Sequence, residues 1–378
     1  MRLSDILKKV NQKPSSPETE LRKQQPLTPP SPSQSSEAQP APPASESVPS
    51  STVSASVPVP EIPSAEDIYT RLIIDIRDIL AAAPRNEPFT APVQLIESLA
   101  KSIEQKPDDI LLLVDRATPD IYLYGHSANV CILSLMMGLS LGIKGEELVL
   151  LGIAALFHDL GMSKSINLAL KNGKLSPAEI NQIKKHPLEG SRFVDLETTL
   201  SDNDKGIIAG AILQVHERWN GTGYPNALKG SGDIGEFARI IAISDVYEAL
   251  AHPRSYRERY IPHEAVKTLI ASSEQDFDSG IVKAFIGRIS LYPPASYVRL
   301  NTDEIGRVVG INPGLPTRPR IRIIIGQDNR RPAELRITDL FSSPTIFIKE
   351  AIDESKLTIS DKKLALELKA IRWWVKGL

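Results

Sequence analysis

Histidine and aspartate side chains that could bind metal ions recur at regular intervals through the middle of the chain. They are His126, His158, Asp159, His186, His216 and Asp245. The pair His158-Asp159 follows an apolar run, where a carboxylate beside an imidazole is costly to bury unless a metal cation or another partner pairs with both. Successive candidates are separated by about thirty residues, roughly the length of one helix and its connection. We therefore predict a bundle in which successive helices each present a ligand to one metal centre.

Each candidate also has an ordinary interpretation when it is taken alone. His126 would more often be a hydrogen-bonded histidine, and His186, which precedes Pro187, would be a cation at a helix end. Asp245 is harder to explain in this way, because it lies in the apolar segment 240–250 and aspartate is seldom buried without a partner. The chain has six histidines, and four of them belong to the series. It is the ordered set that favours a metal site.

The composition is typical of a cytoplasmic protein with a sizeable apolar core. Of the 378 residues 41% are hydrophobic but only 5% aromatic, so Leu, Ile, Val and Ala must form most of the core. The net charge of −2 gives no reason to expect nucleic-acid binding. The single cysteine, Cys131, excludes an internal disulfide and suits a reducing compartment. The N-terminus lacks the apolar region of a secretory signal, and the longest apolar stretch, 130–143, is too short for an integral membrane segment.

Changes in composition divide the chain into five predicted parts. Residues 1–64 are rich in Pro and Ser and contain no aromatic residue, so they cannot bury enough apolar surface to offset their ordering entropy. We expect this part to be a disordered tether. The remaining parts are a helical lead-in at 65–118, a helical domain with the metal site at 119–290, a small β subdomain at 291–352 and a C-terminal amphipathic helix at 353–378. The expected fold class is therefore mostly α, a helical bundle with a small C-terminal β appendage.

Hydrophobic periodicity predicts where the helices and strands lie. The expected helices begin at Ala65 and continue with 93–106, 108–116, 146–157, 176–187, 207–219 and 238–250. The helix at 176 has the Ser cap, the Pro in first position and the Glu in third position that favour a helix start. The expected strands are 297–301, 306–311, 320–325, 334–337 and 345–348.

Several short motifs follow one another between residues of about 120 and 260. They are His126-Ser127, His158-Asp159-Leu160-Gly161, residues 171–176, residues 186–190, His216-Glu217, residues 221–225, Arg239, Asp245 and residues 254–257. Any one of these motifs alone is weak evidence for a protein family. In this order they resemble the HD-GYP family, a branch of the HD-domain metal-dependent phosphohydrolases. Residues 300–306 also resemble sequence that often follows this domain.

The resemblance implies an HD-type helical bundle that hydrolyses cyclic di-GMP to the linear dinucleotide, to GMP or to both, in bacterial second-messenger signalling. It implies two divalent metal ions, with Fe or Mn expected, because two cations can neutralise a phosphodiester and activate water. Asp159 would bridge the ions. The expected ligands are His126, His158 and Asp245 at one ion and His186 and His216 at the other. The expected catalytic residues are Asp159, His158 and Lys164.

The resemblance also implies residues that recognise the substrate and partners. Arg254 and Arg257 are expected to bind the phosphates, since guanidinium groups match phosphate oxygens, and Glu248 is expected to bind the substrate with them. The signature loop consists of Gly221, Gly223, Tyr224 and Pro225. Protein partners are expected at this loop or at the N-terminal tether, and cyclic di-GMP is the expected small-molecule partner.

Three positions depart from the family pattern. Val215 stands where the family has the first of two consecutive histidines, Asn220 replaces an aspartate before the first loop glycine, and Met162 replaces a lysine. Valine cannot coordinate a metal, so one metal position is expected to lack a ligand. Lys164 is a candidate replacement for the missing lysine. Three hypotheses stay open: an active phosphodiesterase, an impaired domain that binds cyclic di-GMP or a protein partner, and a structural adaptor. The intact His158-Asp159 pair favours the enzyme.

Overall fold

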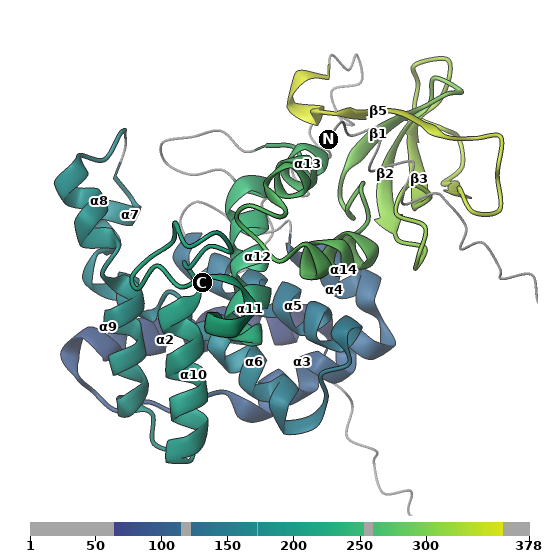
Figure 1. The fold of residues 1–378 in the computed structure, drawn as a ribbon. Helices are drawn as coiled ribbons and strands as arrows, with labels where there is room; N and C mark the ends of the chain where they lie inside the picture. The colour runs from purple at the N-terminus through teal and green to yellow at the C-terminus, as the bar shows by residue number, and fades with distance from the viewer. Residues whose placement is uncertain (1–63, 115–121, 172, 253–259, 358–378) are drawn as a thin grey trace, which may run out of the picture. The chain divides into compact units, whose positions relative to one another are not determined.

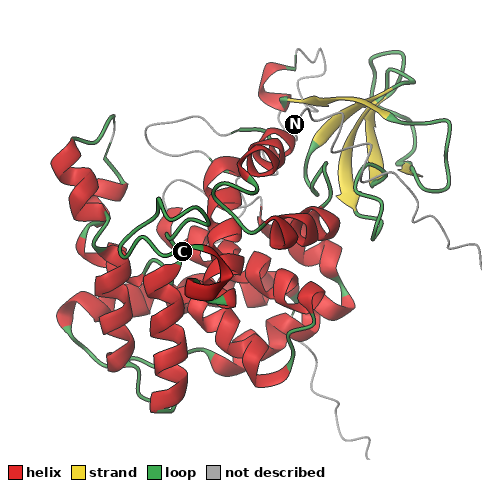
Figure 2. Ribbon diagram, viewed as in Figure 1, coloured by secondary structure: helices red, strands yellow, loops and turns green. Residues whose placement is uncertain are grey.

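Helices form most of the described chain, and a small antiparallel sheet follows them at its C-terminal end (Figures 1 and 2). This confirms the expected fold class. The computed structural model describes residues 64–114, 122–171, 173–252 and 260–357, all of which belong to one compact unit. The predictions made for residues 1–63, for Arg254 and Arg257, and for residues 358–378 lie outside the described residues.

The helical lead-in consists of three helices at the predicted places. They are α2 (Ala65–Ala82), α3 (Val93–Gln105) and α4 (Pro107–Val114), with the short 3-10 helix η1 (Ala83–Arg85) after α2. Ser64 caps α2, since its hydroxyl accepts a hydrogen bond from the Asp67 N–H at 3.1 Å. Ile68, Leu72 and Ile76 recur at helical spacing and are buried. The apolar side of α2 packs against α3, α4 and α5.

The central bundle is built around two helices that are apolar on nearly all sides. They are α5 (Tyr122–Leu141) and α6 (Gly145–Phe157), which lie against each other. The longer helices that surround them are α9 (His186–Phe193), α10 (Asp202–Gln214), α12 (Glu236–Ala251), α13 (Pro262–Ser272) and α14 (Ser279–Ile289). The shorter helices are η3 (Leu160–Lys164), α7 (Ile166–Ala169), α8 (Pro177–Ile183), η4 (Val194–Leu196) and α11 (Gly230–Asp233). The apolar segment that precedes His158 is therefore the C-terminal half of a core helix.

Two helices near the metal ligands have different bounds from those predicted. The helix expected over 176–187 ends at Ile183, and α9 begins at His186 with Pro187 in its first turn. Proline lacks the N–H that a helix interior needs but suits a first turn. His186 therefore starts a helix and does not lie at a helix C-terminus. The helix expected over 207–219 begins at Asp202, where Ser201 caps it, and ends at Gln214.

The C-terminal sheet has the strand order β4-β3-β2-β1-β5 and is antiparallel throughout. The strands are β1 (Tyr297–Leu300), β2 (Ile305–Gly310), β3 (Arg320–Ile325), β4 (Ile337–Asp339) and β5 (Ile348–Ile352), and the 3-10 helix η5 (Glu354–Lys356) follows. The predictions for the last two strands were wrong by about three residues. Both are edge strands whose side chains are mostly exposed or only partly buried, so the alternation of buried and exposed residues marks their ends poorly.

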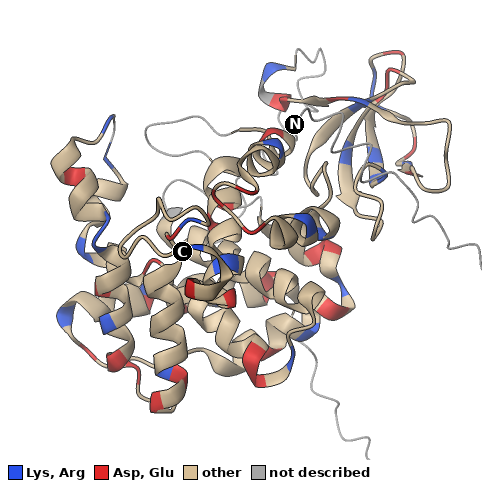
Figure 3. Ribbon diagram, viewed as in Figure 1, with Lys and Arg blue, Asp and Glu red and all other residues tan. Residues whose placement is uncertain are grey.

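Charged residues of both signs are interspersed along the helices and strands (Figure 3). This distribution agrees with the small net charge of the chain. Among the described residues, the helices are either too short or too polar to cross a membrane.

Candidate metal centre

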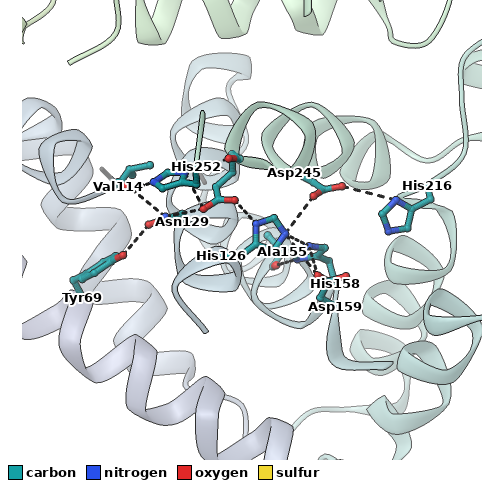
Figure 4. A network of polar contacts seen from close by, with 11 residues as sticks. Tyr69, Val114, His126, Asn129, Ala155, His158, Asp159, His216, Asp245 and His252 are labelled. Carbon is teal, nitrogen blue, oxygen red and sulfur yellow. Dashed lines mark hydrogen bonds and ion pairs between the residues drawn. The ribbon is translucent and has the colours of Figure 1, made fainter. Parts of the chain in front are cut away.

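The structure brings all six predicted ligands to one place in the bundle. Figure 4 shows them except for His186. His126 lies on α5 and Asp245 on α12, whereas His158 and Asp159 follow the last residue of α6. The other two are His186, the first residue of α9, and His216, which follows the end of α10. Helix ends thus supply four of the six side chains. His126, His158 and His186 are almost fully buried, and His216, Asp159 and Asp245 keep between 10% and 14% of their side chains exposed.

The first of two groups consists of His126, His158 and Asp159. One ligand atom from each lies within 4.8 Å of the others. The Nε2 atoms of His126 and His158 are 3.3 Å apart, and Asp159 Oδ2 is 3.6 Å from His126 Nε2. Asp245 adds a second carboxylate, with its Oδ1 atom 3.3 Å from His126 Nε2. This group therefore offers two imidazole nitrogens and two carboxylate oxygens.

The second group shares Asp159 with the first. Asp159 Oδ1 lies 3.3 Å from His186 Nε2, which is 2.8 Å from His216 Nε2. Asp245 also faces this side, with Oδ2 at 3.8 Å from His216 Nδ1. The two oxygens of Asp159 therefore face different groups, as a carboxylate that bridges two cations must.

The hydrogen bonds of the imidazole rings test whether this donor set fits a metal. His158 Nδ1 lies 2.8 Å from the main-chain oxygen of Ala155, and His126 Nδ1 contacts a carboxylate oxygen of Glu248. Because both Nδ1 atoms face acceptors, both donate, and the two Nε2 atoms point toward the centre. They face each other at 3.3 Å beside the carboxylates of Asp159 and Asp245, an arrangement that suits a shared cation. The residues present therefore fit a divalent metal ion bound by nitrogen and oxygen.

The carboxylates of the site are ionised despite their burial. Burial alone would raise the pKa of Asp159, but His158 and His186 outweigh it and lower that pKa. The pKa of Asp245 is likewise lowered, since its contact with His126 outweighs burial. For His216, burial and the neighbouring His186 lower the pKa to about 3. At neutral pH His216 is therefore neutral, which is the form that binds a metal.

The signature loop folds against the ligand His216. The Tyr224 N–H donates to the main-chain oxygen of His216 at 3.2 Å, and the Tyr224 ring stacks on the imidazole. The buried Glu217 carboxylate fixes the end of the loop, because it accepts hydrogen bonds from the N–H groups of Asn226 at 2.7 Å and Leu228 at 3.0 Å. A Cβ atom on Gly223 would overlap the main chain of Glu217, so only glycine permits this approach.

Glycine is also required directly after the His-Asp pair. A Cβ atom on Gly161 would overlap the main-chain oxygen of His186. The absence of a side chain lets η3 lie against the first turn of α9. This contact places Asp159 beside His186 and explains why Gly161 belongs to the motif.

One expectation for the substrate site was wrong. Glu248 was expected to bind substrate, but its side chain is fully buried and contacts His126 and Asn129. A substrate cannot reach a carboxylate with no exposed surface, so Glu248 supports a metal ligand instead. Lys164 is about half exposed, and its Nζ atom lies 4.0 Å from Glu189 Oε2 and 4.9 Å above the Phe193 ring. These contacts draw Lys164 toward α9, and its catalytic role stays a prediction.

The three departures from the family pattern occupy ordinary structural positions. Val215 is fully buried at the C-terminal end of α10, and Met162 is buried in η3. Asn220 Oδ1 accepts hydrogen bonds from Thr222 N–H at 3.0 Å and from its hydroxyl at 2.6 Å. An aspartate would accept the same two bonds, so the exchange leaves this turn intact.

Sequence reasoning missed three polar residues next to the ligands. They are Tyr69, Asn129 and His252, which are joined through hydrogen bonds to Glu248. Two signals could have found Asn129 and His252. Asn129 lies three residues after His126 on one helix, and His252 lies four residues after Glu248, spacings at which helical side chains face the same way.

Comparisons with known proteins agree with this geometry. Residues 117–281 match the family model of the HD domain, and residues 297–360 match that of a KOW domain associated with the HD domain. The chain is 29% identical over 247 residues to cyclic di-GMP phosphodiesterase PA4108 of Pseudomonas aeruginosa, covering 65% of this chain and 58% of that protein. It is 35% identical over 213 residues to the cyclic di-GMP phosphodiesterase response regulator RpfG of Xanthomonas campestris pv. campestris, covering 55% of this chain and 51% of that protein.

Among solved structures, Bd1817, an HDG"Y"P protein from Bdellovibrio bacteriovorus, aligns with a TM-score of 0.46 and 21% identity over 61% of this chain and 73% of that one. The chain spans about half the length of the curated relatives it matches. The matches confirm the resemblance found in the motifs: residues 117–281 are an HD domain of the kind present in proteins named cyclic di-GMP phosphodiesterases.

Proposed function

We propose that this chain is a metal-dependent phosphodiesterase that hydrolyses cyclic di-GMP to the linear dinucleotide, to GMP or to both. The observation that carries the proposal is the placement of Asp159, whose two oxygens face two separate groups of imidazole nitrogens. A bridged pair of cations is a recurring device for cleaving phosphodiesters. The names of the curated relatives supply the substrate.

Two divalent ions, iron or manganese, would be held by the two groups. His126, His158 and Asp245 would hold the first with Asp159 Oδ2, and His186 and His216 would hold the second with Asp159 Oδ1. The bound cations would neutralise the phosphodiester and activate a water molecule. The chain itself contributes fixed geometry: burial and Nδ1 hydrogen bonds hold the rings of His126, His158 and His186 in one orientation before substrate arrives. The stacked ring of Tyr224 restricts His216.

The proposal extends to the substrate, the domains and the partners. In the sequence Arg254 and Arg257 come three and six residues after Ala251, the last residue of α12, which carries Asp245, and they would bind the phosphates. The catalytic domain would span 119–290 and the β subdomain 291–352, since α14 ends at Ile289 and β1 begins at Tyr297. Residues 225–227 are exposed at the signature loop and would leave a surface for a protein partner. The single buried cysteine supports a cytoplasmic location as part of the proposal.

The test measures metal content and turnover of the full chain together. We expect close to two equivalents of iron or manganese and conversion of cyclic di-GMP to a linear product. His158→Ala and Asp159→Ala should abolish turnover and reduce the bound metal, whereas His263→Ala, a histidine outside the site, should change neither. Metal-loaded protein that binds the dinucleotide and returns it intact would contradict the proposal and would identify a binding module.

A further inference from the structure

A buried chain of hydrogen bonds leads from the ligand His126 to the helical lead-in (Figure 4). Its centre is the carboxylate of Glu248, which has no exposed surface. One oxygen of this carboxylate contacts His126 Nδ1. The other accepts a hydrogen bond from Asn129 Nδ2 at 3.0 Å and lies 3.1 Å from His252 Nδ1. Three residues therefore supply donors to the two oxygens of Glu248.

The orientation of the Asn129 amide is set from outside the bundle core. The Tyr69 hydroxyl, on α2, donates to Asn129 Oδ1 at 3.0 Å, which turns the NH2 group of the amide toward Glu248. The same NH2 group donates to the main-chain oxygen of Val114, at the end of α4, at 3.0 Å. An amide held at both ends cannot flip without leaving buried polar atoms unpaired.

His252 is held in the same way. Its Nε2 atom lies 2.8 Å from the main-chain oxygen of Val114, and its Nδ1 atom lies 3.1 Å from both the main-chain oxygen and the carboxylate of Glu248. All of these partners are acceptors, so they fix the ring at both of its nitrogens. The fixed ring in turn holds the buried Glu248 carboxylate in place, with no buried polar atom of the pair left without a partner.

His126 differs from two other candidate ligands in the partner of its Nδ1 atom. The Nδ1 atoms of His158 and His186 each donate to a main-chain oxygen three residues earlier, that of Ala155 or Ile183. Those bonds form wherever the local helix end forms. The Nδ1 bond of His126 depends instead on a side chain 122 residues away, which has many rotamers unless other residues hold it. Support by a second layer of residues therefore matters most at His126.

We propose that Tyr69, Asn129 and His252 are positioning residues for the metal centre, which act through Glu248 to hold His126 with its Nε2 lone pair toward the metal. The helical lead-in is then a working part of the centre, although Tyr69 and Val114 lie before the residues that match the HD domain. This inference rests on the proposed function, because it presumes that the centre binds metal.

The experiment titrates metal-free full-length protein with Mn²⁺ against a competing chelator. His252→Gln and Asn129→Leu should weaken binding at one of the two positions by roughly 10- to 100-fold, the range typical for partners of metal-bound histidine. The other position, at His186 and His216, should keep its affinity. Tyr69→Phe keeps the size of the side chain and removes only the hydroxyl, and it should weaken the same position by about 3- to 10-fold.

His263→Gln is the matched control, since His263 is a partly buried histidine outside the centre whose Nδ1 atom also donates to a main-chain oxygen, that of Leu291, at 2.9 Å. It should bind Mn²⁺ like the unchanged protein. Thermal unfolding of each metal-free variant shows whether it folds, and Tyr69→Phe keeps the test decisive if either larger change prevents folding. Equal Mn²⁺ affinity in folded Tyr69→Phe, Asn129→Leu and His252→Gln would overturn this inference alone. Failure of the unchanged protein to bind Mn²⁺ would overturn the proposed function with it.

Discussion

The phenol ring of Tyr224 lies parallel to the imidazole of His216, with ring centroids 5.0 Å apart and planes inclined by only 9°. The signature loop was expected to serve protein partners, yet this stack ties it to a metal ligand. His216 follows the end of α10 and has no helix of its own to hold its ring. The loop therefore restricts the one histidine ligand that the secondary structure leaves least constrained.

Removal of the Tyr224 ring should loosen the second metal position. We expect Tyr224→Ala to weaken metal binding there by about 3- to 10-fold, the value of one aromatic pair. Tyr224→Phe retains the stacked ring and should bind metal as before. Competition titrations with Mn²⁺ would measure both. Equal affinities for Tyr224→Ala and Tyr224→Phe would show that the stack does not position His216.

A methyl group at Gly161 should disturb the contact between η3 and α9. Because the new Cβ atom would overlap the main-chain oxygen of His186, we expect Gly161→Ala to cost about 2 kcal/mol of unfolding free energy and to release the second metal. Gly206→Ala is the control, since a Cβ atom there meets nothing within 4 Å on an exposed side of α10. That variant should be unchanged or slightly more stable. Urea unfolding with metal analysis measures both effects.

Glu197 should make stability depend on pH below neutrality. Its buried carboxylate accepts hydrogen bonds from the N–H groups of Ala91, Thr199 and Leu200, at 3.1, 2.8 and 2.7 Å, and from the Thr199 hydroxyl. Burial opposes ionisation, but these donors outweigh it and lower the pKa. Because the folded protein holds the ionised form more strongly than the unfolded chain does, the stabilisation is complete above the ordinary pKa of glutamate. It is lost as the pH falls through the lowered pKa of the folded state.

Glu197→Gln removes this contribution, and we expect it to lower the unfolding free energy at pH 7 by about 2 kcal/mol. The difference between the variant and the unchanged protein should shrink as the pH falls below 4. Chemical unfolding at several pH values measures it. A difference that stays constant with pH would mean that the charge of Glu197 contributes nothing.

The clustering of the six candidate metal ligands could be predicted because the chemistry limits the choice of residue and the fold limits the spacing. Few side chains bind metals, and one helix with its loop sets the interval of about thirty residues that separates His126, His158, His186 and His216. The role of Glu248 could not be predicted in this way. It lies three residues after Asp245 on one helix, so spacing alone places both on the same side. Only the packing of α5 against α12 decides that Glu248 contacts the Nδ1 atom of His126, on the side of the ring away from the metal centre.

The bounds of a helix or strand could be predicted where burial of apolar side chains sets them. They could not be predicted where hydrogen bonds to a neighbouring strand set them. The core helix α6 ends at the predicted residue because its apolar run ends there. The edge strands β4 and β5 are defined by their hydrogen bonds to β3 and β1, and periodicity carries little of that information. The role of Asn129 could not be identified from the sequence for a related reason. A single asparagine in an apolar helix shows that it needs partners but not which ones, and its partners come from α2, α4 and α12.

Val215→His tests whether the missing imidazole limits this domain. Val215 is fully buried directly before His216, so a histidine there would be costly to bury without a partner, and we expect the metal-free variant to be less stable by about 1–3 kcal/mol. A metal ion at the second position would recover this cost by binding the new nitrogen, so metal affinity should rise at least tenfold. Val215→Leu is the control, because it alters the packing without adding a ligand. Paired measurements of thermal unfolding with and without Mn²⁺ would show the effect as a larger metal-induced rise in the melting temperature. The same rise in Val215→His and Val215→Leu would mean that His186, His216 and Asp159 already complete the second position.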